Sequence, residues 1–525
     1  MTALPPDLGP PLAENAGRRR RRRPAAAPEA PAAPRSAAYR QLRNPFPAVP
    51  VFTEDRVAAI HESALTVLED LGMAVLAPEA RALFARAGAR VDEDTGLVRI
   101  GREIVEAALE TAPPSIPLKA GAPHRDLTLE LGTLVFQSGA GAPHAHDRLR
   151  GRRPGTLTDF EEMTTLVQAF DVLHMLSPGT EPQDVPVHLR HYATTRAVLT
   201  LSDKVPFVFA RGRGQVADAF EMIRLARGLD AEAFRAAAHV YTIINTNSPR
   251  TLDVPMAEGL IDFARAGQLS IVTPFCLMGA MAPVTVAGAL TLSHAEALAG
   301  ISLTQLARPG APVLYGAFAS SVDMRSGAPA FGTPEQVKAS LGAGQLARLI
   351  GLPWRGSAGC AANVNDAQAA QETVMSAWGA VLAGATVVLH GAGWMEGGLT
   401  VSFEKIITDL EALQVFAELC APVPADDAAL AMDALAEVAP GGHFFACAHT
   451  MARYRDAFYP PLVADWSNHG AWVEKGSLDA DARATALWQA ALADTPRPAL
   501  DPARLAAIDA FIARRSAEGG APPVA

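Results

Sequence analysis

The sequence predicts an α/β protein whose central domain is a (β/α)8 TIM-type barrel, with an N-terminal helical extension and a C-terminal extension. Two observations predict this fold. From about residue 130, eight short apolar runs recur, and each is followed by a longer amphipathic run. The short runs are apolar throughout rather than alternating, which is typical of parallel strands buried on both faces. Right-handed crossovers place each strand beside the last, so eight such units favour a closed barrel.

The eight predicted strands are the short apolar runs 133–137, 172–177, 205–210, 239–245, 270–275, 312–318, 352–357 and 386–390. The helices are expected near 158–170, 187–201, 215–227, 254–266, 285–307, 333–350, 366–384 and 402–420. Thr333, Asp366 and Ser402 are the expected N-caps of the last three, because their side chains can accept from free backbone N–H groups. An open doubly wound sheet is the alternative, but the sequence has no dinucleotide-binding glycine fingerprint.

The chain divides into four predicted segments: 1–45, 46–130, 131–420 and 421–525. The first is a Pro/Ala-rich basic tail, expected to be disordered because it has almost no large apolar residues. Its nine arginines and three acidic residues give +6, which leaves −16 for the remainder because the whole chain carries −10. The run Arg18–Arg23 either binds an anionic partner or is a solvated extension. The acidic body offers no basic face, so we expect no nucleic-acid partner.

The segment 46–130 is expected to be helical, with Ile60–Leu71 strongly amphipathic, and 421–525 to pack on the barrel. Hydrophobic residues make up 49% of the 525 residues, which is ample for a large core. Four scattered cysteines imply no disulfide framework and favour a cytoplasmic location. The uncharged stretch 269–293 contains Pro274, Gly279 and Pro283. We therefore interpret it as a buried strand, a loop and a helix start rather than a membrane span.

Active sites of barrel enzymes lie where the strands end. The sequence places many aromatic and amide side chains there and few acids, and aromatic faces hold cationic ligands well. The predicted substrate-binding residues are Asn245, Phe275, Tyr315, Phe318, Arg325, Trp354, Gln368 and Trp394. The aromatic members either form a cage for a cation or pack as ordinary core and rim residues.

Two residues are candidate catalytic groups. His390 closes the eighth predicted strand, a position that favours a functional role over a structural one. Glu396 lies in the glycine-rich loop that follows. It either balances a substrate cation or caps the loop.

A metal site is the alternative chemistry. His443, Cys447 and His449 are residue types that zinc accepts as ligands. Their spacing matches no closed structural zinc site, and no fourth ligand lies nearby in sequence. His144 and His146 form a weaker pair in a loop. We therefore expect no bound metal.

Several segments together resemble the trimethylamine methyltransferase family, over roughly residues 45 to 490. The matching stretches are Ile244–Pro249, Gly279–Thr285, Arg308–Gly316, Asp323–Glu335, Asn365–Ala370, Gly393–Gly398 and Gly441–Phe445 with His449–Thr450. The resemblance implies a barrel fold and transfer of a methyl group from a small methylated amine to a corrinoid (cobalamin) cofactor. It also implies that a separate corrinoid-binding protein carries this cofactor.

Trimethylamine enzymes of the family carry pyrrolysine near the segment that here reads Cys360–Gln368, which holds only ordinary residues. The resemblance therefore favours a quaternary amine such as glycine betaine. Arg325 would then pair with the betaine carboxylate, or else anchor its own loop. We expect a homo-oligomer. Two other hypotheses remain: a zinc-dependent barrel lyase or methyltransferase, and a non-catalytic amine-binding protein on the same fold.

Overall fold

The computed structural model divides the chain into two units, residues 1–35 and 36–525. It describes residues 39–524. The Arg18–Arg23 run and most of the predicted tail lie outside the described residues. The prediction that the disordered tail extends to residue 45 is wrong at its C-terminal end. There β1 (Leu42–Arg43) pairs antiparallel with β7 (Thr133–Phe136), and Leu42 is buried. A strand pairing ninety residues away in sequence leaves no local signal.

A parallel sheet forms the centre of the second unit. Its parallel strands, in spatial order, are β7, β18 (Val387–Leu389), β17 (Trp354–Ser357), β14 (Val313–Gly316), β12 (Leu269–Val272) and β10 (Tyr241–Ile244). Single parallel bridges join Phe136 to Leu173, Met175 to Val205 and Phe207 to Tyr241. All eight predicted runs therefore take part in parallel pairing. The third run cannot form a full ladder at Pro206, which lacks an N–H donor.

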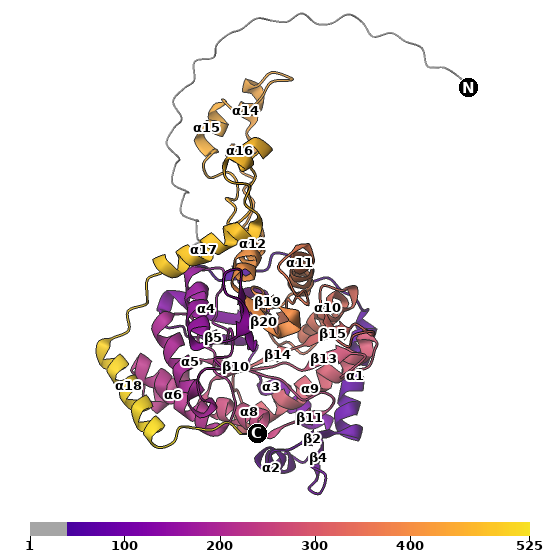
Figure 1. Cartoon of the computed structure of the whole chain (residues 1–525). Helices are drawn as coiled ribbons and strands as arrows, with labels where there is room; N and C mark the ends of the chain where they lie inside the picture. Colours follow the sequence, from indigo (N-terminus) through magenta and orange to yellow (C-terminus); the bar gives the residue numbers. More distant parts are fainter. Residues whose placement is uncertain (1–38, 525) are drawn as a thin grey trace, which may run out of the picture. The chain divides into compact units, whose positions relative to one another are not determined.

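A helix follows each of the eight runs. They are α4 (Leu157–Ala169), α5 (Val187–Leu201), α6 (Arg213–Arg227), α8 (Val254–Ala266), α9 (Val286–Ala307), α10 (Pro334–Leu349), α11 (Ala367–Leu382) and α12 (Phe403–Leu419). Each contacts the next along the chain, and Figure 1 shows them on the outside of the central strands. The predicted caps are confirmed: Thr333, Asp366 and Ser402 each accept a hydrogen bond from the first turn of their helix.

The sheet has two differently covered faces. On one, side chains such as Val135 and Leu314 pack against the hairpin of β5 (Ser115–Leu118) and β6 (Leu127–Glu130); we call this the hairpin face. On the other, Phe136 and Tyr315 pack against the surrounding helices; we call this the helix face. Because successive strand residues point to opposite faces, neighbours in sequence have different surroundings. Burial of both faces explains why the strands are apolar throughout.

The segment 46–130 contains strands as well as the expected helices. The helical elements are α1 (Glu54–Thr66), the π-helix η1 (Val67–Leu71), α2 (Pro78–Arg86) and α3 (Arg102–Thr111). Besides β5 and β6, the strands are β2 (Met73–Val75), β3 (Arg90–Asp92) and β4 (Leu97–Arg99), in a sheet with β11 (Thr251–Leu252). The prediction of a helical segment is corrected: strands of three or four residues are too short to show a period that a sequence window can detect.

The C-terminal segment packs on the helices at two places. In α17 (Ala480–Asp494), the Trp488 indole donates to Glu404 of α12 over 2.9 Å, and its ring centre lies 5.1 Å from that of Phe403. In α18 (Pro502–Ala517), Arg515 pairs with Asp218 of α6. Between α12 and α17, the segment that contains the short helices α13 (Asp427–Leu430), α14 (Met432–Glu437), α15 (Ala448–Arg453) and α16 (His469–Glu474) leaves many large apolar side chains exposed.

The stretch 269–293 comprises β12, the short strand β13 (Phe275–Met278), a loop and the start of α9, as the sequence predicted. Among the described helices, α9 alone is long and apolar enough to cross a membrane by length and composition. Because 78% of its apolar window is buried inside the protein, its composition is that of a core helix.

Candidate active site

Four aromatic side chains meet where the parallel strands end, and we call them the aromatic cluster: Phe275, Phe318, Phe331 and Trp394. They come from β13, β15 (Phe318–Val322), the residue after β16 (Pro329–Ala330), and β19 (Trp394–Met395). The Phe318 ring centre lies 4.9 Å from that of Phe275, 5.7 Å from Phe331 and 5.8 Å from Trp394. Three of the five predicted cage residues are thus neighbours, and Phe331 joins them without having been predicted.

The loop that carries Trp394 has an unusual backbone. Between residues 390 and 398, His390 and Glu396 adopt left-handed φ angles of 60° and 54°, a conformation that non-glycine residues rarely hold without support. At Gly398, φ is 105°, and a Cβ atom would lie 2.6 Å from the Trp394 ring. Glycine is therefore required here for the loop to lie against the indole.

His390 is buried against this cluster. Its Nδ1 lies 2.9 Å from the Ser357 hydroxyl, and its ring contacts Trp394 edge to face. Burial, reinforced by the nearby positive charge of Arg355, holds the pKa of His390 well below its ordinary value. His390 is therefore a neutral imidazole that can orient a ligand but does not carry charge at neutral pH.

Arg355 lies beside His390 and, like Phe331, is not among the predicted site residues. It is paired in register with Val387, so it points to the hairpin face, and its guanidinium carbon lies 5.0 Å from the centre of the Phe318 ring. Its exposed fraction is 2%, and Nε and Nη1 have no hydrogen-bond partner. Burial lowers the pKa of Arg355 to about 9, so it stays charged at neutral pH. A charge inside an otherwise apolar predicted strand was the available signal.

A polar pair lies on the same face. The Gln137 amide donates to the carbonyl of Leu176 over 3.3 Å and to the Tyr241 hydroxyl, which in turn donates to the same carbonyl. Burial raises the pKa of Tyr241 far above its ordinary value. This pair supplies neutral hydrogen-bonding groups and no acid that could protonate a ligand near neutral pH.

The remaining two predicted cage residues point away from the cluster. Tyr315 lies on the helix face, with its hydroxyl 3.1 Å from Nδ1 of His294 in α9. Trp354 lies on the same face and donates its indole N–H to the carbonyl of Gly384 over 3.0 Å. The adjacent residues in sequence, Leu314 and Arg355, point to the hairpin face. With both faces apolar, the sequence carried no alternation that could tell the two apart.

The three polar residues predicted to bind substrate are exposed. Asn245 directly follows β10. Arg325 lies in the turn after Asp323, which accepts its backbone N–H. Gln368 lies in the first turn of α11 and donates to Glu372 over 2.7 Å. None of the three contacts the aromatic cluster through a hydrogen bond, so strand-end position alone was too coarse a guide.

Glu396 already has a counter-ion. Arg152 of β9 (Gly151–Pro154) donates to both of its carboxylate oxygens at 2.9 Å. Burial opposes ionisation, but the hydrogen bonds and the positive charge of Arg152 outweigh it and lower the pKa of Glu396. The loop-capping alternative is therefore the one that its contacts favour.

The residues considered as alternative zinc ligands do not gather. Within residues 39–524, no group of three or more His, Cys, Asp or Glu side chains is placed to hold a metal ion. His443, Cys447 and His449 are included in this range, as are His144 and His146. All four cysteines of the chain are free.

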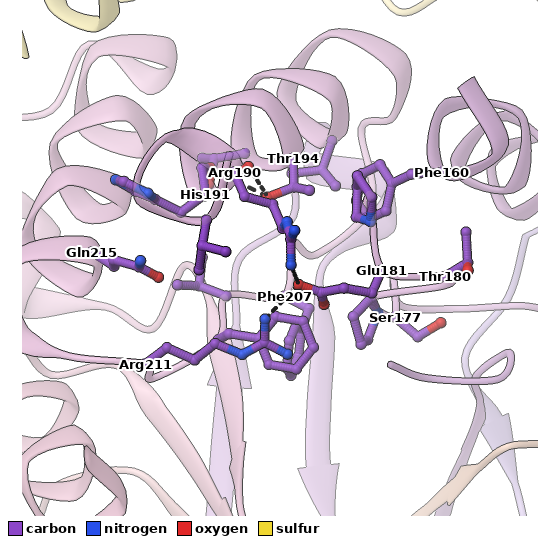
Figure 2. Close-up of a pocket in the computed structure, with 17 residues that line it drawn as sticks. Phe160, Ser177, Thr180, Glu181, Arg190, His191, Thr194, Phe207, Arg211 and Gln215 are labelled. Atoms are coloured by element: carbon purple, nitrogen blue, oxygen red, sulfur yellow. Dashed lines mark hydrogen bonds and ion pairs between the residues drawn. The ribbon is translucent and has the colours of Figure 1, made fainter. Parts of the chain in front are cut away.

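A second candidate site lies at the ends of the runs 172–177 and 205–210 (Figure 2). There Glu181 accepts hydrogen bonds from Arg190 at 2.7 Å and Arg211 at 2.6 Å, and Arg211 lies 3.9 Å from the centre of the Phe209 ring. The cavity between these side chains measures about 40 Å³. That leaves room for only a few water molecules, and the charges lining it are already paired.

Aromatic and polar side chains gathered at the carboxyl ends of parallel strands are typical of an α/β protein that binds a small ligand there. The chain belongs to the trimethylamine methyltransferase family, since the family model described as Trimethylamine methyltransferase (MTTB) matches residues 15–520.

Two relatives and one solved structure illustrate the likeness. A Desulfitobacterium hafniense (strain Y51) protein named glycine betaine methyltransferase is 35% identical over 478 residues, or 90% of this chain and 99% of that protein. A D. hafniense (strain DSM 10664 / DCB-2) trimethylamine methyltransferase is 29% identical, covering 82% of this chain and 87% of its own length. The Methanosarcina barkeri monomethylamine methyltransferase structure is more distant, with 9% identity and a TM-score of 0.42 over 85% of this chain and 93% of that one.

Proposed function

We propose that this protein transfers a methyl group from a small quaternary amine to a corrinoid carried by a partner protein. The observation that carries the proposal is the aromatic cluster with a neutral His390 and no free acid. Aromatic faces attract a quaternary ammonium, and each such contact is worth about 0.5–2 kcal/mol. A relative that covers 90% of this chain bears the name glycine betaine methyltransferase.

The chemistry suits an acid-free site. When a methyl group leaves a quaternary nitrogen, the C–N bond breaks and its electron pair stays on nitrogen, so a neutral tertiary amine departs without a proton. Transfer from neutral trimethylamine would instead need a proton donor at nitrogen. The candidate donors are unsuited to that task, because His390 is held neutral and Glu396 is ion-paired with Arg152. Quaternary amines are therefore favoured over trimethylamine.

The acceptor would be a reduced corrinoid, which supplies a cobalt nucleophile when bound and has no need of an acid or base from this chain. The donor chemistry of the aromatic cluster fits such a reaction, because the cluster excludes water and offers no competing proton. Phe275, Phe318 and Trp394 hold the ammonium group. His390, fixed by its hydrogen bond with Ser357, orients it.

The architecture that this function needs is a closed barrel. Parallel pairing connects β7 to β10 through β18, β17, β14 and β12, and the three single bridges connect β10 back to β7 through the runs 205–210 and 172–177. This pairing supports closure of the eight runs into one (β/α)8 barrel at 131–420. We propose that 46–130 and 421–525 are extensions of this barrel and that the protein works as a homo-oligomer. We also propose a cytoplasmic location, with which the four free cysteines agree.

The test is a methyl-transfer assay in which loss of cob(I)alamin is followed by absorbance and the demethylated amine by mass spectrometry. We expect glycine betaine or another quaternary amine to react and trimethylamine to be inert. Reaction with trimethylamine alone would contradict the proposal. Tight amine binding without transfer, even to the cognate corrinoid protein, would instead establish the binding-protein alternative.

A further inference from the structure

The segment 421–478 joins α12 to α17, and we call it the arm. It contains the short helices α13 to α16, and only three of its residues are buried, namely Ala434, Cys447 and Val463. In Figure 1, α14, α15 and α16 lie apart from the helices that surround the strands. A segment that buries so little of itself does not offset the entropy lost on ordering it, so such units usually depend on a partner.

The arm carries a concentration of exposed apolar side chains. Every exposed Phe, Tyr or Trp side chain within residues 39–524 belongs to it: Phe444, Phe445, Tyr454, Phe458 and Trp466. Phe445 and Phe458 are 82% and 84% exposed. Given the area of an aromatic side chain, these residues together leave roughly 500–800 Å² uncovered. A specific interface buries about 800 Å² on each partner, so the arm is large enough to form one.

A groove of about 590 Å³ lies between α13, α14 and α15 of the arm. It is lined by apolar and acidic side chains, among them Leu430, Met432, Asp427, Asp433 and Glu437. Arg453 borders the same groove, and Arg455 follows it in sequence. None of these acids and arginines takes part in an ion pair within the described part of the chain. The arm thus offers apolar surface together with unpaired charges of both signs.

We propose that the arm joins two copies of this chain, arm against arm around a two-fold axis. In such an interface the same surface is used twice, so it must be complementary to itself. The arm meets this condition, because its acids can face the arginines of the other copy while the aromatic side chains pack together. No surface elsewhere in residues 39–524 offers exposed aromatic side chains for the arm to match.

The apolar character of the arm favours a permanent partner over a transient one. Transient interfaces are about as apolar as the ordinary protein surface, whereas obligate homodimer interfaces are more apolar. A corrinoid carrier that leaves after each transfer would expose the aromatic side chains again, and large exposed apolar patches promote aggregation. A second copy stays bound. The proposal is independent of the methyl-transfer chemistry and gives the proposed homo-oligomer its interface.

The experiment is sedimentation velocity of the full-length protein over a range of concentrations. We expect wild type to contain an even number of chains. Phe445→Ser/Phe458→Ser should raise the dissociation constant by at least about 100-fold, because both copies lose the two contacts. Val284→Ser/Met324→Ser is the matched control, since these side chains are 68% and 73% exposed outside the arm, and it should associate as wild type does. A monomeric wild type, or an unchanged dissociation constant in the arm variant, overturns the proposal.

Charge reversal provides a second pair of variants if Phe445→Ser/Phe458→Ser does not fold. Arg453→Glu/Arg455→Glu and Asp427→Lys/Asp433→Lys/Glu437→Lys should each associate at least about 10-fold more weakly than wild type, because like charges then face each other. An equal mixture of the two should recover the wild-type affinity as a heterodimer, because arms of opposite charge then meet. This recovery requires that the partner be a second copy. A mixture that associates no better than either variant alone overturns the arm-against-arm interface.

Discussion

Two regions near the ends of the parallel strands contain buried or partly buried arginines, and they differ in whether a carboxylate pairs with the arginine. Arg190 and Arg211 share Glu181 between the second and third runs (Figure 2). Arg355, in the seventh, has no carboxylate at all. Both regions are largely buried and both include an arginine near an aromatic ring. The charges of the first region are therefore paired within the chain, whereas the second region holds a buried guanidinium without a counter-ion.

The comparison predicts a large loss of stability in the first region. Glu181→Gln should lower the free energy of unfolding by about 2–4 kcal/mol, because two partly buried guanidinium groups lose their counter-ion. The value stays below that of a fully buried pair because the Arg211 side chain is 36% exposed. Urea denaturation measures it. Glu93→Gln is the control, since Glu93 is 68% exposed in its pair with Arg81 and should change stability by less than about 1 kcal/mol.

The same ion pair predicts a pH dependence with a defined sign. Burial opposes ionisation of Glu181, but hydrogen bonds and attraction from Arg211 and Arg190 outweigh it and lower its pKa below the ordinary 4.5. Its contribution is therefore fully present above that pH and is lost as the pH falls through the lowered value. The stability difference between wild type and Glu181→Gln should shrink on acidification. A difference that stays constant down to pH 3 would show that the carboxylate charge is not what stabilises the region.

In the second region, the aromatic cluster predicts a smaller effect on binding. Trp394→Ala should weaken the binding of a quaternary amine by about 2- to 30-fold, the range of one cation–π contact. Tyr315→Phe is the control, because Tyr315 points to the helix face and its hydroxyl lies beside His294. Calorimetry of both variants checks the prediction. Equal losses in the two would mean that the binding site is not at the aromatic cluster.

For His390 we expect no effect of pH on the methyl-transfer rate near neutrality. Because burial and Arg355 hold the pKa of His390 well below its ordinary 6.5, its charge should not change between about pH 6 and 8. The methyl-transfer rate should therefore show no step in this range that disappears in His390→Gln. Such a step would mean that His390 titrates, and would make it a proton-transfer group rather than an orienting one.

The sequence was a good guide to the pairing segments and a poor one to side-chain direction. Apolar runs, caps and crossovers predicted the eight parallel pairing segments and their helices, because these signals are local. Trp354 and Arg355 are adjacent in a strand and therefore point to opposite faces of the sheet. A strand that is apolar on both faces shows no alternation from which the face of each residue could be predicted. Phe331 was missed for a related reason: it reaches the cluster through the β15–β16 hairpin, a contact set by tertiary pairing.

The family resemblance added what periodicity could not. It pointed to the loop Gly393–Gly398, and Trp394 of that loop is part of the aromatic cluster. It did not distinguish Arg325 from Arg355. Only burial and the missing hydrogen-bond partners of Arg355 make that distinction, and neither is visible in a sequence.

The most direct test of the central claim, that the substrate binds at the aromatic cluster beside Arg355, is the stability of Arg355→Met with and without glycine betaine, measured by urea denaturation. If the charge is kept for a ligand, the ligand-free variant should be at least as stable as wild type. Glycine betaine at 100 times its wild-type Kd should then stabilise wild type by about 2.7 kcal/mol and the variant by about half as much or less. A variant that is several kcal/mol less stable without ligand, and that gains as much from glycine betaine as wild type does, would contradict the account.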